Sequence, residues 1–144
     1  MYLQNVIKEF GVKEMANDFA YTVKTDKKFD DVVTALEQIV PQHQFRILHT
    51  HDVQATLAEK GFQRDPLKII EVCNSGFAHK ALQINMDVAL FMPCRYTVYT
   101  EGAKTIVSLG RPTMISQMLP QAEFRELADE VETKLIVILN EAIK

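Results

Sequence analysis

FAYTVKTDKKFDDVVTALEQIVPQ, residues 19–42, contains two hydrophobic periods in succession. Apolar side chains first recur at every second position, which is typical of a half-buried strand, at Phe19, Tyr21 and Val23. They then recur at three- and four-residue intervals, as on one face of a helix, at Phe29, Val32, Val33, Leu36 and Ile39. We expect Thr25 or Asp26 to cap this helix and Pro41 to stop it, because proline cannot donate a helical hydrogen bond. The stretch therefore predicts a strand followed by a helix.

The remainder of the chain contains more strands than helices. We predict strands over residues 45–51, 67–73, 88–100 and 105–109, with an interruption at Pro93 and a turn at Glu101-Gly102. We predict three further helices: a brief one that Asp52 caps and Gly61 ends, a short one that Asn74 or Ser75 caps, and a last one over residues 124–142. Because this order lacks regular βαβ alternation, it predicts an α+β fold of two layers, with helices packed on one face of a largely antiparallel sheet.

The whole chain, residues 1–144, is predicted to form a single α+β domain. We expect a helical extension over residues 1–16, a core over 17–110, and a loop with Pro112 and Pro120 before the C-terminal helix within 111–144. Ile136 and Val137 widen the apolar face of that helix. A helix that is apolar on more than one side usually meets something on each, so we expect a second subunit and a homodimer.

Composition argues against several classes of function. The net charge is −3, and the sequence shows no basic cluster of the kind that phosphate binding requires, so we do not expect a nucleic-acid partner. No apolar stretch approaches the roughly 20 residues of a membrane span, and the N-terminus does not resemble a secretion signal. Two cysteines do not make a disulfide-stapled scaffold. We therefore predict a cytoplasmic protein that is not an integral membrane protein.

Cys73 and Cys94 are the strongest candidates for chemistry. Cys73 ends a predicted strand just ahead of a helix, where backbone N–H groups can lower a thiol pKa and make it nucleophilic. The alternative is a buried thiol that acts as a small apolar side chain. Arg95 adjoins Cys94, but neighbours on a strand point to opposite faces, so we expect Cys94 to be structural.

If the helix between them folds one cysteine strand beside the other, the two thiols become neighbours. They could then form a reversible disulfide, a soft-metal site with His79, or two walls of a ligand pocket. Their spacing matches no standard zinc pattern. His49 and His51 could ligate a metal, but such pairs more often bond locally and no third ligand is near in sequence, so we predict no metal site.

No standard catalytic motif is present, and no cofactor is predicted. The acidic residues of the last helix lie mainly opposite its apolar face, so we expect them to form a solvated surface instead of acid–base pairs. They are Glu123, Glu126, Asp129, Glu130 and Glu132.

Two segments carry a resemblance to a known family. EVCN at residues 71–74, followed by Ala78 and Leu82, and PCRYTVY at residues 93–99 resemble the family catalogued as domain of unknown function 302. The order of elements from Phe19 to Leu109 is also similar, which covers about two thirds of the chain. This chain has Ser75 where that family often has proline, and this difference affects only the shape of the turn.

The resemblance implies a compact α+β fold with a curved sheet backed by helices, and a homodimer, but no reaction. It places Cys73, Asn74, Pro93, Cys94 and Arg95 at the family's motif positions.

We therefore expect a binding module, not an enzyme, that takes a small or thiol-reactive ligand near Cys73 and Cys94. Arg95 could hold an anionic group of that ligand through its planar donors. The predicted ligand-binding residues are Cys73, Asn74, Ser75, His79, Pro93, Cys94 and Arg95. A second hypothesis is thiol redox or sulfur-transfer chemistry, with a lowered pKa at Cys73 as nucleophile and Cys94 as resolving thiol. A third is a structural or oligomeric interaction protein.

Overall fold

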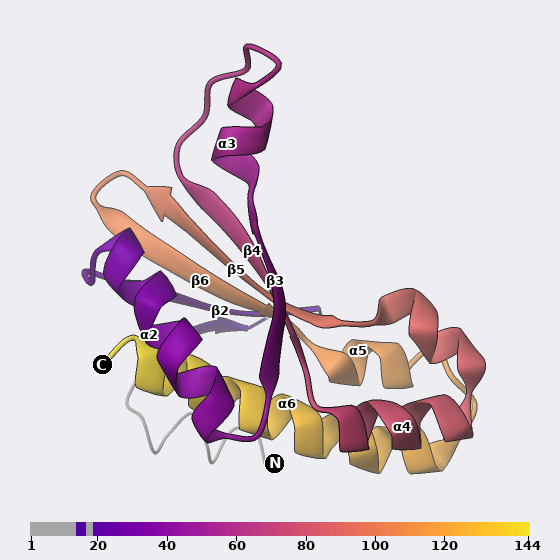
Figure 1. The fold of residues 1–144 in the computed structure, drawn as a ribbon. Coiled ribbons are helices and arrows are strands. Elements are labelled where there is room, and N and C mark those ends of the chain that lie inside the picture. Colours follow the sequence, from indigo (N-terminus) through magenta and orange to yellow (C-terminus); the bar gives the residue numbers. More distant parts are fainter. Residues whose placement is uncertain (1–13, 17–18) are drawn as a thin grey trace.

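The computed structural model describes residues 14–16 and 19–144, which form strands and helices in an α+β arrangement (Figure 1). The elements, in chain order, are β1 (Glu14–Ala16), β2 (Ala20–Thr25), α2 (Phe29–Gln42), β3 (Arg46–Asp52), α3 (Val53–Ala58), β4 (Leu67–Cys73), α4 (Ser75–Ile84), the 3₁₀ helix η1 (Met86–Phe91), β5 (Cys94–Glu101), β6 (Lys104–Gly110), α5 (Pro112–Ser116) and α6 (Ala122–Ala142).

The strands form one open sheet in the order β1-β2-β6-β5-β4-β3, and every neighbouring pair is antiparallel. The predicted fold class is therefore confirmed. Strands β4 and β5, which carry the two cysteines at their ends, are direct neighbours with Val72 opposite Cys94.

One face of the sheet carries the core. Its buried side chains lie at alternate positions of β2, β4, β5 and β6, and they pack against α2 and α6. The buried hydroxyl of Tyr96 donates to the backbone oxygen of Leu135 on α6 at 2.6 Å, which attaches the long helix to the middle of the sheet. On β2, the hydroxyl of Tyr21 donates to Asn140 Oδ1 of α6 at 3.3 Å. The prediction that helices cover one face is confirmed by these contacts.

The strand–helix unit at residues 20–42 forms as predicted, but its boundaries differ. Helix α2 begins at Phe29 with Lys28 as its N-cap and without a side-chain cap. The predicted caps were wrong because Thr25 Oγ1 accepts from the N–H of Lys27 instead, at 3.1 Å, and so shapes the turn before the helix. Pro41 lies inside the last turn, and the helix ends at Gln42.

Three other elements differ from those predicted from the sequence. Residues 88–91 belong to η1 and not to a strand, because the side chain of Asn85 accepts from Asp87 N at 2.8 Å and starts a helical turn. The Met92–Pro93 peptide bond is cis, and strand β5 begins only at Cys94. The short helix α5 lies in the predicted loop, with Pro112 in its first turn, where the missing N–H costs nothing.

At the N-terminus, Glu14–Ala16 form a strand paired with β2 where a helix was predicted. The rest of that predicted helix lies outside the described residues.

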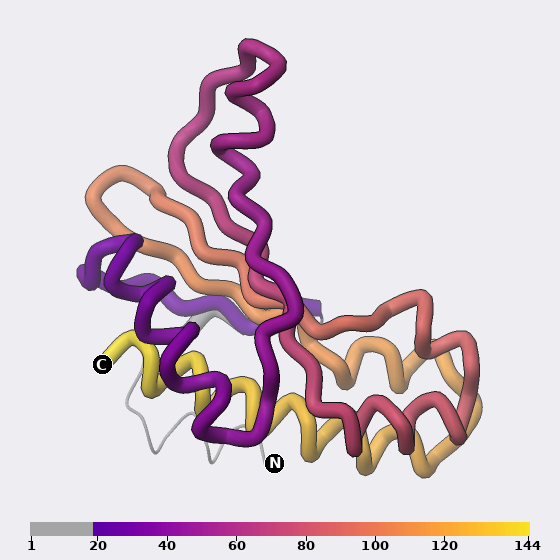
Figure 2. Tube along the Cα trace, in the orientation of Figure 1, coloured from indigo at the N-terminus to yellow at the C-terminus, as the bar shows by residue number. Residues whose placement is uncertain are grey.

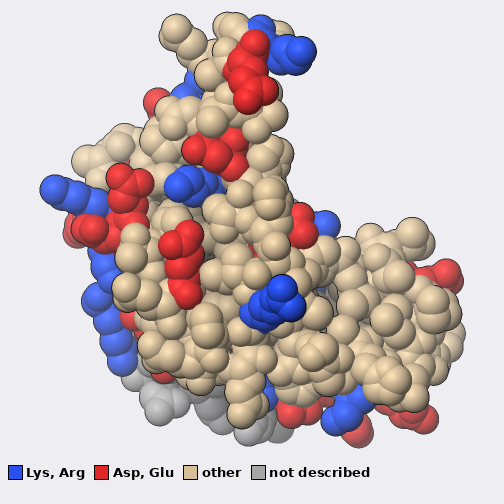
Figure 3. Space-filling model, viewed as in Figure 1, with Lys and Arg blue, Asp and Glu red and all other residues tan. Residues whose placement is uncertain are grey.

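Two parts of the molecule extend from the sheet (Figures 1 and 2). Strands β3 and β4 carry α3 at the tip of an arm, and Asp52 caps α3 by accepting from Ala55 N at 2.9 Å, as predicted. On another side, α4, η1 and α5 gather with the N-terminal half of α6 into a helical lobe. Acidic and basic side chains are interspersed on the face drawn in Figure 3. Within residues 14–16 and 19–144, no helix has the length and apolar character of a membrane span.

Candidate apolar cavity

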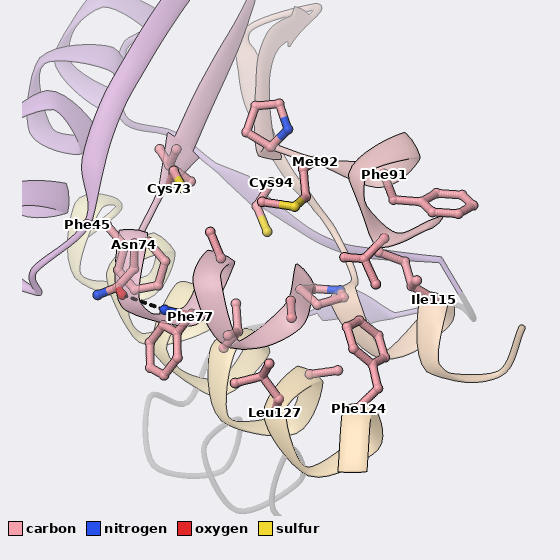
Figure 4. A pocket seen from close by; sticks show the side chains of 18 residues that line it. Phe45, Cys73, Asn74, Phe77, Phe91, Met92, Cys94, Ile115, Phe124 and Leu127 are labelled. Atoms are coloured by element: carbon pink, nitrogen blue, oxygen red, sulfur yellow. Dashed lines mark hydrogen bonds between the residues drawn. The ribbon is translucent and has the colours of Figure 1, made fainter. Parts of the chain in front are cut away.

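A cavity lies in the helical lobe, where the ends of β4 and β5 meet α4, η1, α5 and α6 (Figure 4). The centre of a water-sized molecule can occupy ≈ 70 Å³ of it, several times the roughly 10–15 Å³ that one water needs on that measure. Its lining consists of Phe45, Val72, Cys73, Asn74, Phe77, Ala78, Ala81, Val88, Phe91, Met92, Pro93, Cys94, Pro112, Ile115, Phe124, Leu127, Ala128 and Val131. Almost all of these side chains are apolar, so the cavity favours apolar contents.

The first wall is fixed by Asn74, the residue between β4 and α4. Its Oδ1 accepts from Phe77 N at 3.0 Å, which caps α4, and its Nδ2 donates to the backbone oxygen of Gln44 at 3.0 Å. Both ends of the Asn74 amide are therefore engaged by the protein. Phe77 packs near Phe45, with ring centroids 6.1 Å apart. Of the two predicted caps, Asn74 is the one that caps α4.

The second wall comes from the segment Met92-Pro93-Cys94. The cis bond before Pro93 lies between η1 and β5, and the pairing of β5 with β4 places Cys94 beside Val72. Cys73 and Cys94 thus line the same cavity, which follows from the pairing of the two strands that carry them.

Both cysteines are free, half-buried thiols. Burial raises the pKa of Cys73. Burial, and to a smaller extent the charge of Cys73, raise the pKa of Cys94 to about 11, although Arg95 lowers it slightly. The predicted lowering of the Cys73 pKa was wrong, because apolar neighbours disfavour the thiolate and the Phe77 N–H at the start of α4 is already bonded to Asn74. Both thiols are therefore protonated near neutral pH.

Three of the predicted ligand-binding residues lie away from the cavity. Ser75, His79 and Arg95 are exposed, and none of them belongs to its lining. Arg95 alternates along β5 with Cys94 and Tyr96, so its side chain faces the other side of the sheet. The structure brings Cys73, Asn74, Pro93 and Cys94 together.

The histidine pair lies in the middle and second half of β3, whereas Arg46 at the start of that strand is the residue opposite Cys73. The rings of His49 and His51 have centroids 6.2 Å apart, and His51 Nε2 lies 3.1 Å from Thr56 Oγ1. Among the residues that the structure describes, no group of three or more His, Cys, Asp or Glu side chains could hold a metal ion.

The aromatic and small residues of the lining were missed as a site. Sequence periodicity predicts only that residues such as Phe77, Phe124 and Leu127 are core. A signal that could have pointed to the cavity is the presence of small side chains, Ala81 and Ala128, at inward positions of α4 and α6, because small side chains leave space where helices meet.

Four of the five acidic residues predicted to form a solvated surface on the last helix are exposed, and Glu132 is the exception. It is only 2 % exposed, and its Oε1 accepts from the N–H of Thr113 at 3.2 Å and from Thr113 Oγ1 at 2.7 Å. Both of its oxygens also lie 3.4 Å from Arg111 nitrogens. The carboxylate is buried because α5, which was not predicted, packs over this side of α6.

The comparisons agree with the resemblance in the two motif segments. The family model described as domain of unknown function DUF302 matches residues 21–142. A crystal structure of the uncharacterized conserved protein DUF302 from Bacillus stearothermophilus is similar to this chain, with 32% sequence identity, a TM-score of 0.81, and coverage of 86% of this chain and 98% of that one. No curated protein matches the chain. A match over most of the sequence and a shared fold establish that this chain belongs to the family of domain of unknown function DUF302.

Proposed function

We propose that this protein is a binding module that takes a small uncharged molecule, or an apolar group of a larger one, into the cavity beside Cys73 and Cys94. One observation supports the proposal above all: the described residues that line the cavity include no charged side chain, and their one polar side chain, Asn74, is already bonded at both ends. Burying a charge without a partner is costly, so such a cavity selects neutral, apolar ligands.

Access to the cavity supports binding as well. Cys73, Met92, Cys94 and Ile115 are only half-buried, so parts of the lining lie within reach of solvent. Each Å² of apolar surface that a ligand buries there contributes about 25 cal/mol. A ligand as small as benzene is therefore expected to bind weakly, with a Kd on the order of 1 mM, which corresponds to about −4 kcal/mol.

Fluorobenzene titrations observed by fluorine NMR test the proposal. We expect saturable binding to the native protein and loss of that binding in Ala78→Leu, because the larger side chain fills the cavity. Ala35→Leu is the matched control, since Ala35 is half-buried on α2 and does not line the cavity. Equal binding to both variants, or no binding to the native protein, would contradict the proposal.

The thiol chemistry hypothesis is less favoured by the same site. A nucleophilic Cys73 requires a lowered pKa, whereas burial raises it. We therefore propose no reaction, and we assign the thiols to the wall of the binding site, where a thiol-reactive ligand would meet them. Free thiols suit the reducing cytoplasm, which is the compartment that we propose.

We also propose that the protein forms a homodimer through β3, the strand at one end of the sheet. An edge strand offers unpaired backbone groups to another chain. If two copies of β3 pair antiparallel about His49, Arg46 of one copy lies opposite Asp52 of the other, so the exposed charges at the strand ends are complementary. Residue 48 interrupts the regular pairing with β4.

Light scattering on two matched variants tests the dimer. Leu48 is 49% exposed on β3 and Leu90 is 79% exposed in the helical lobe. We expect a native dimer that Leu48→Lys converts to a monomer and that Leu90→Lys leaves intact. A native monomer, or a dimer that only Leu90→Lys dissociates, would rule out the β3 interface.

A further inference from the structure

Residues 111–121 connect β6 to α6 and supply one wall of the cavity. Pro112 and Ile115, both on α5, belong to that wall, and Ile115 is seen beside Phe124 in Figure 4. Helix α5 has only five residues. Helices much shorter than about 12 residues are marginal by themselves, so the position of this wall depends on how the segment is attached to its surroundings.

The first attachment is strong and buried. The carboxylate of Glu132 holds the start of α5 through the N–H and hydroxyl of Thr113 and through Arg111. Hydrogen bonds to an ionised carboxylate are roughly twice as strong as bonds between neutral groups. This end of the segment therefore stays in place when the middle of the segment moves.

At the other end, Gln121 is the N-cap of α6 and its backbone oxygen accepts from Phe124 N at 3.2 Å. A single bond between neutral side chains joins this end to the facing helices. Asn85 Nδ2 donates to Gln121 Oε1 at 3.1 Å. Asn85 lies between α4 and η1, which form the facing part of the cavity, so this bond joins the two sides of the lobe. Between the attachments, Gln117, Met118 and Pro120 are exposed.

We propose that residues 111–121 are the gate of the cavity, hinged where Glu132 holds Thr113 and latched where Asn85 bonds Gln121. The inference rests on the cavity being the binding site, and it adds how a ligand enters and leaves. Breaking the latch frees the segment between the Glu132 attachment and the start of α6 to shift together with Ile115, which widens the opening of the lining toward solvent.

A gate has a kinetic signature that a purely structural contact lacks. Entry and exit pass through the same opening, so a weaker latch raises the association and dissociation rates together while the Kd stays nearly constant. The net contribution of one neutral hydrogen bond corresponds to a rate increase of about 2- to 12-fold.

Exchange of fluorobenzene with the full chain, measured by fluorine NMR line shapes, tests the gate. Gln121→Ala is expected to raise both rates by this factor with a Kd within about twofold of native. Gln121→Glu, which keeps an acceptor oxygen for Asn85, is expected to restore the native rates. Gln117→Ala is the control, because its side chain is exposed on the same segment.

Unchanged rates in Gln121→Ala, or a rise in the dissociation rate alone, would overturn the gate while leaving the binding site intact. Failure of the native protein to bind fluorobenzene would overturn the binding proposal and the gate with it.

Discussion

Cys94 shows how surroundings decide what a residue can do. In sequence it adjoins Arg95, yet we expected a structural thiol, and burial indeed outweighs Arg95 and raises the Cys94 pKa to about 11. Tyr96, two residues along β5, is also buried, and burial likewise raises its pKa. The fold therefore favours the protonated forms of both groups.

This raised pKa predicts how stability depends on pH. In the unfolded chain a cysteine ionises near pH 8.5, whereas folded Cys94 holds its proton until about pH 11. Its stabilising contribution is fully present below the unfolded pKa and is lost as pH rises toward the folded one. Between these two pKa values, the unfolding free energy is expected to fall as pH rises. We expect Cys94→Ala to make this fall less steep, by the equivalent of up to about one proton. Urea titrations between these pH values measure the slope, and an unchanged slope would contradict the assigned pKa.

Sequence predicted part of the site at this scale. It indicated that Cys73, Asn74, Pro93 and Cys94 would meet, because two neighbouring strands end there. Strand alternation indicated that Arg95 points away from Cys94, but the sequence could not show which face of the sheet borders the cavity, so Arg95 was wrongly placed among the ligand-binding residues. Nor could it show that Glu132 is buried, because burial of one helix side depends on an element elsewhere in the chain.

Among the elements, α4 depends on its first residue. Asn74 caps the helix and also holds the backbone of Gln44, so it joins β4, α4 and the α2–β3 connection. We expect Asn74→Ala to lower the unfolding free energy by about 1–2 kcal/mol, through loss of the cap and of the donor to Gln44. Asn74→Asp keeps the capping oxygen but loses the donor to Gln44, so its unfolding free energy should lie between those of the native protein and Asn74→Ala. Ser75→Ala should change the unfolding free energy by no more than about 0.5 kcal/mol. If Ser75→Ala lost as much unfolding free energy as Asn74→Ala, this assignment of the cap would be contradicted.

Helix α5 depends on a residue outside itself. Glu132→Ala leaves the N–H and hydroxyl of Thr113 without their acceptor, and we expect a loss of about 2–3 kcal/mol. Glu130, two residues earlier on the same helix, is exposed, so Glu130→Ala should change stability by less than about 0.5 kcal/mol. Chemical denaturation of both variants measures the difference. Equal losses would mean that burial of Glu132 contributes nothing specific.

Elements with a long, regular hydrophobic period were predictable. The strand at Leu67–Cys73 and the last helix follow their periods closely. Helices η1 and α5 were not predicted, because each is about two turns or less and is started by a local feature, the Asn85 side chain or Pro112, that no period reveals. Propensity is a weak guide for such short pieces, and tertiary contacts decide.

For the whole molecule, the covered face of the sheet supplies stability and the lobe at one end supplies the candidate site. Helix α6 serves both, since its C-terminal half packs on the sheet and Phe124 and Leu127 line the cavity. The crystal structure from Bacillus stearothermophilus shares this fold over 98% of its chain. The central claim is that the space beside Cys94 takes an apolar guest while the rest of the fold stays unchanged.

Diffraction from crystals of the protein held under xenon tests that claim most directly, because xenon enters apolar cavities and scatters strongly. We predict a xenon atom inside the lining, near Cys94 and Leu127, and no xenon there in Ala78→Leu crystals. A cavity that remains empty under xenon in the native protein, with xenon only at the outer surface, would contradict the account.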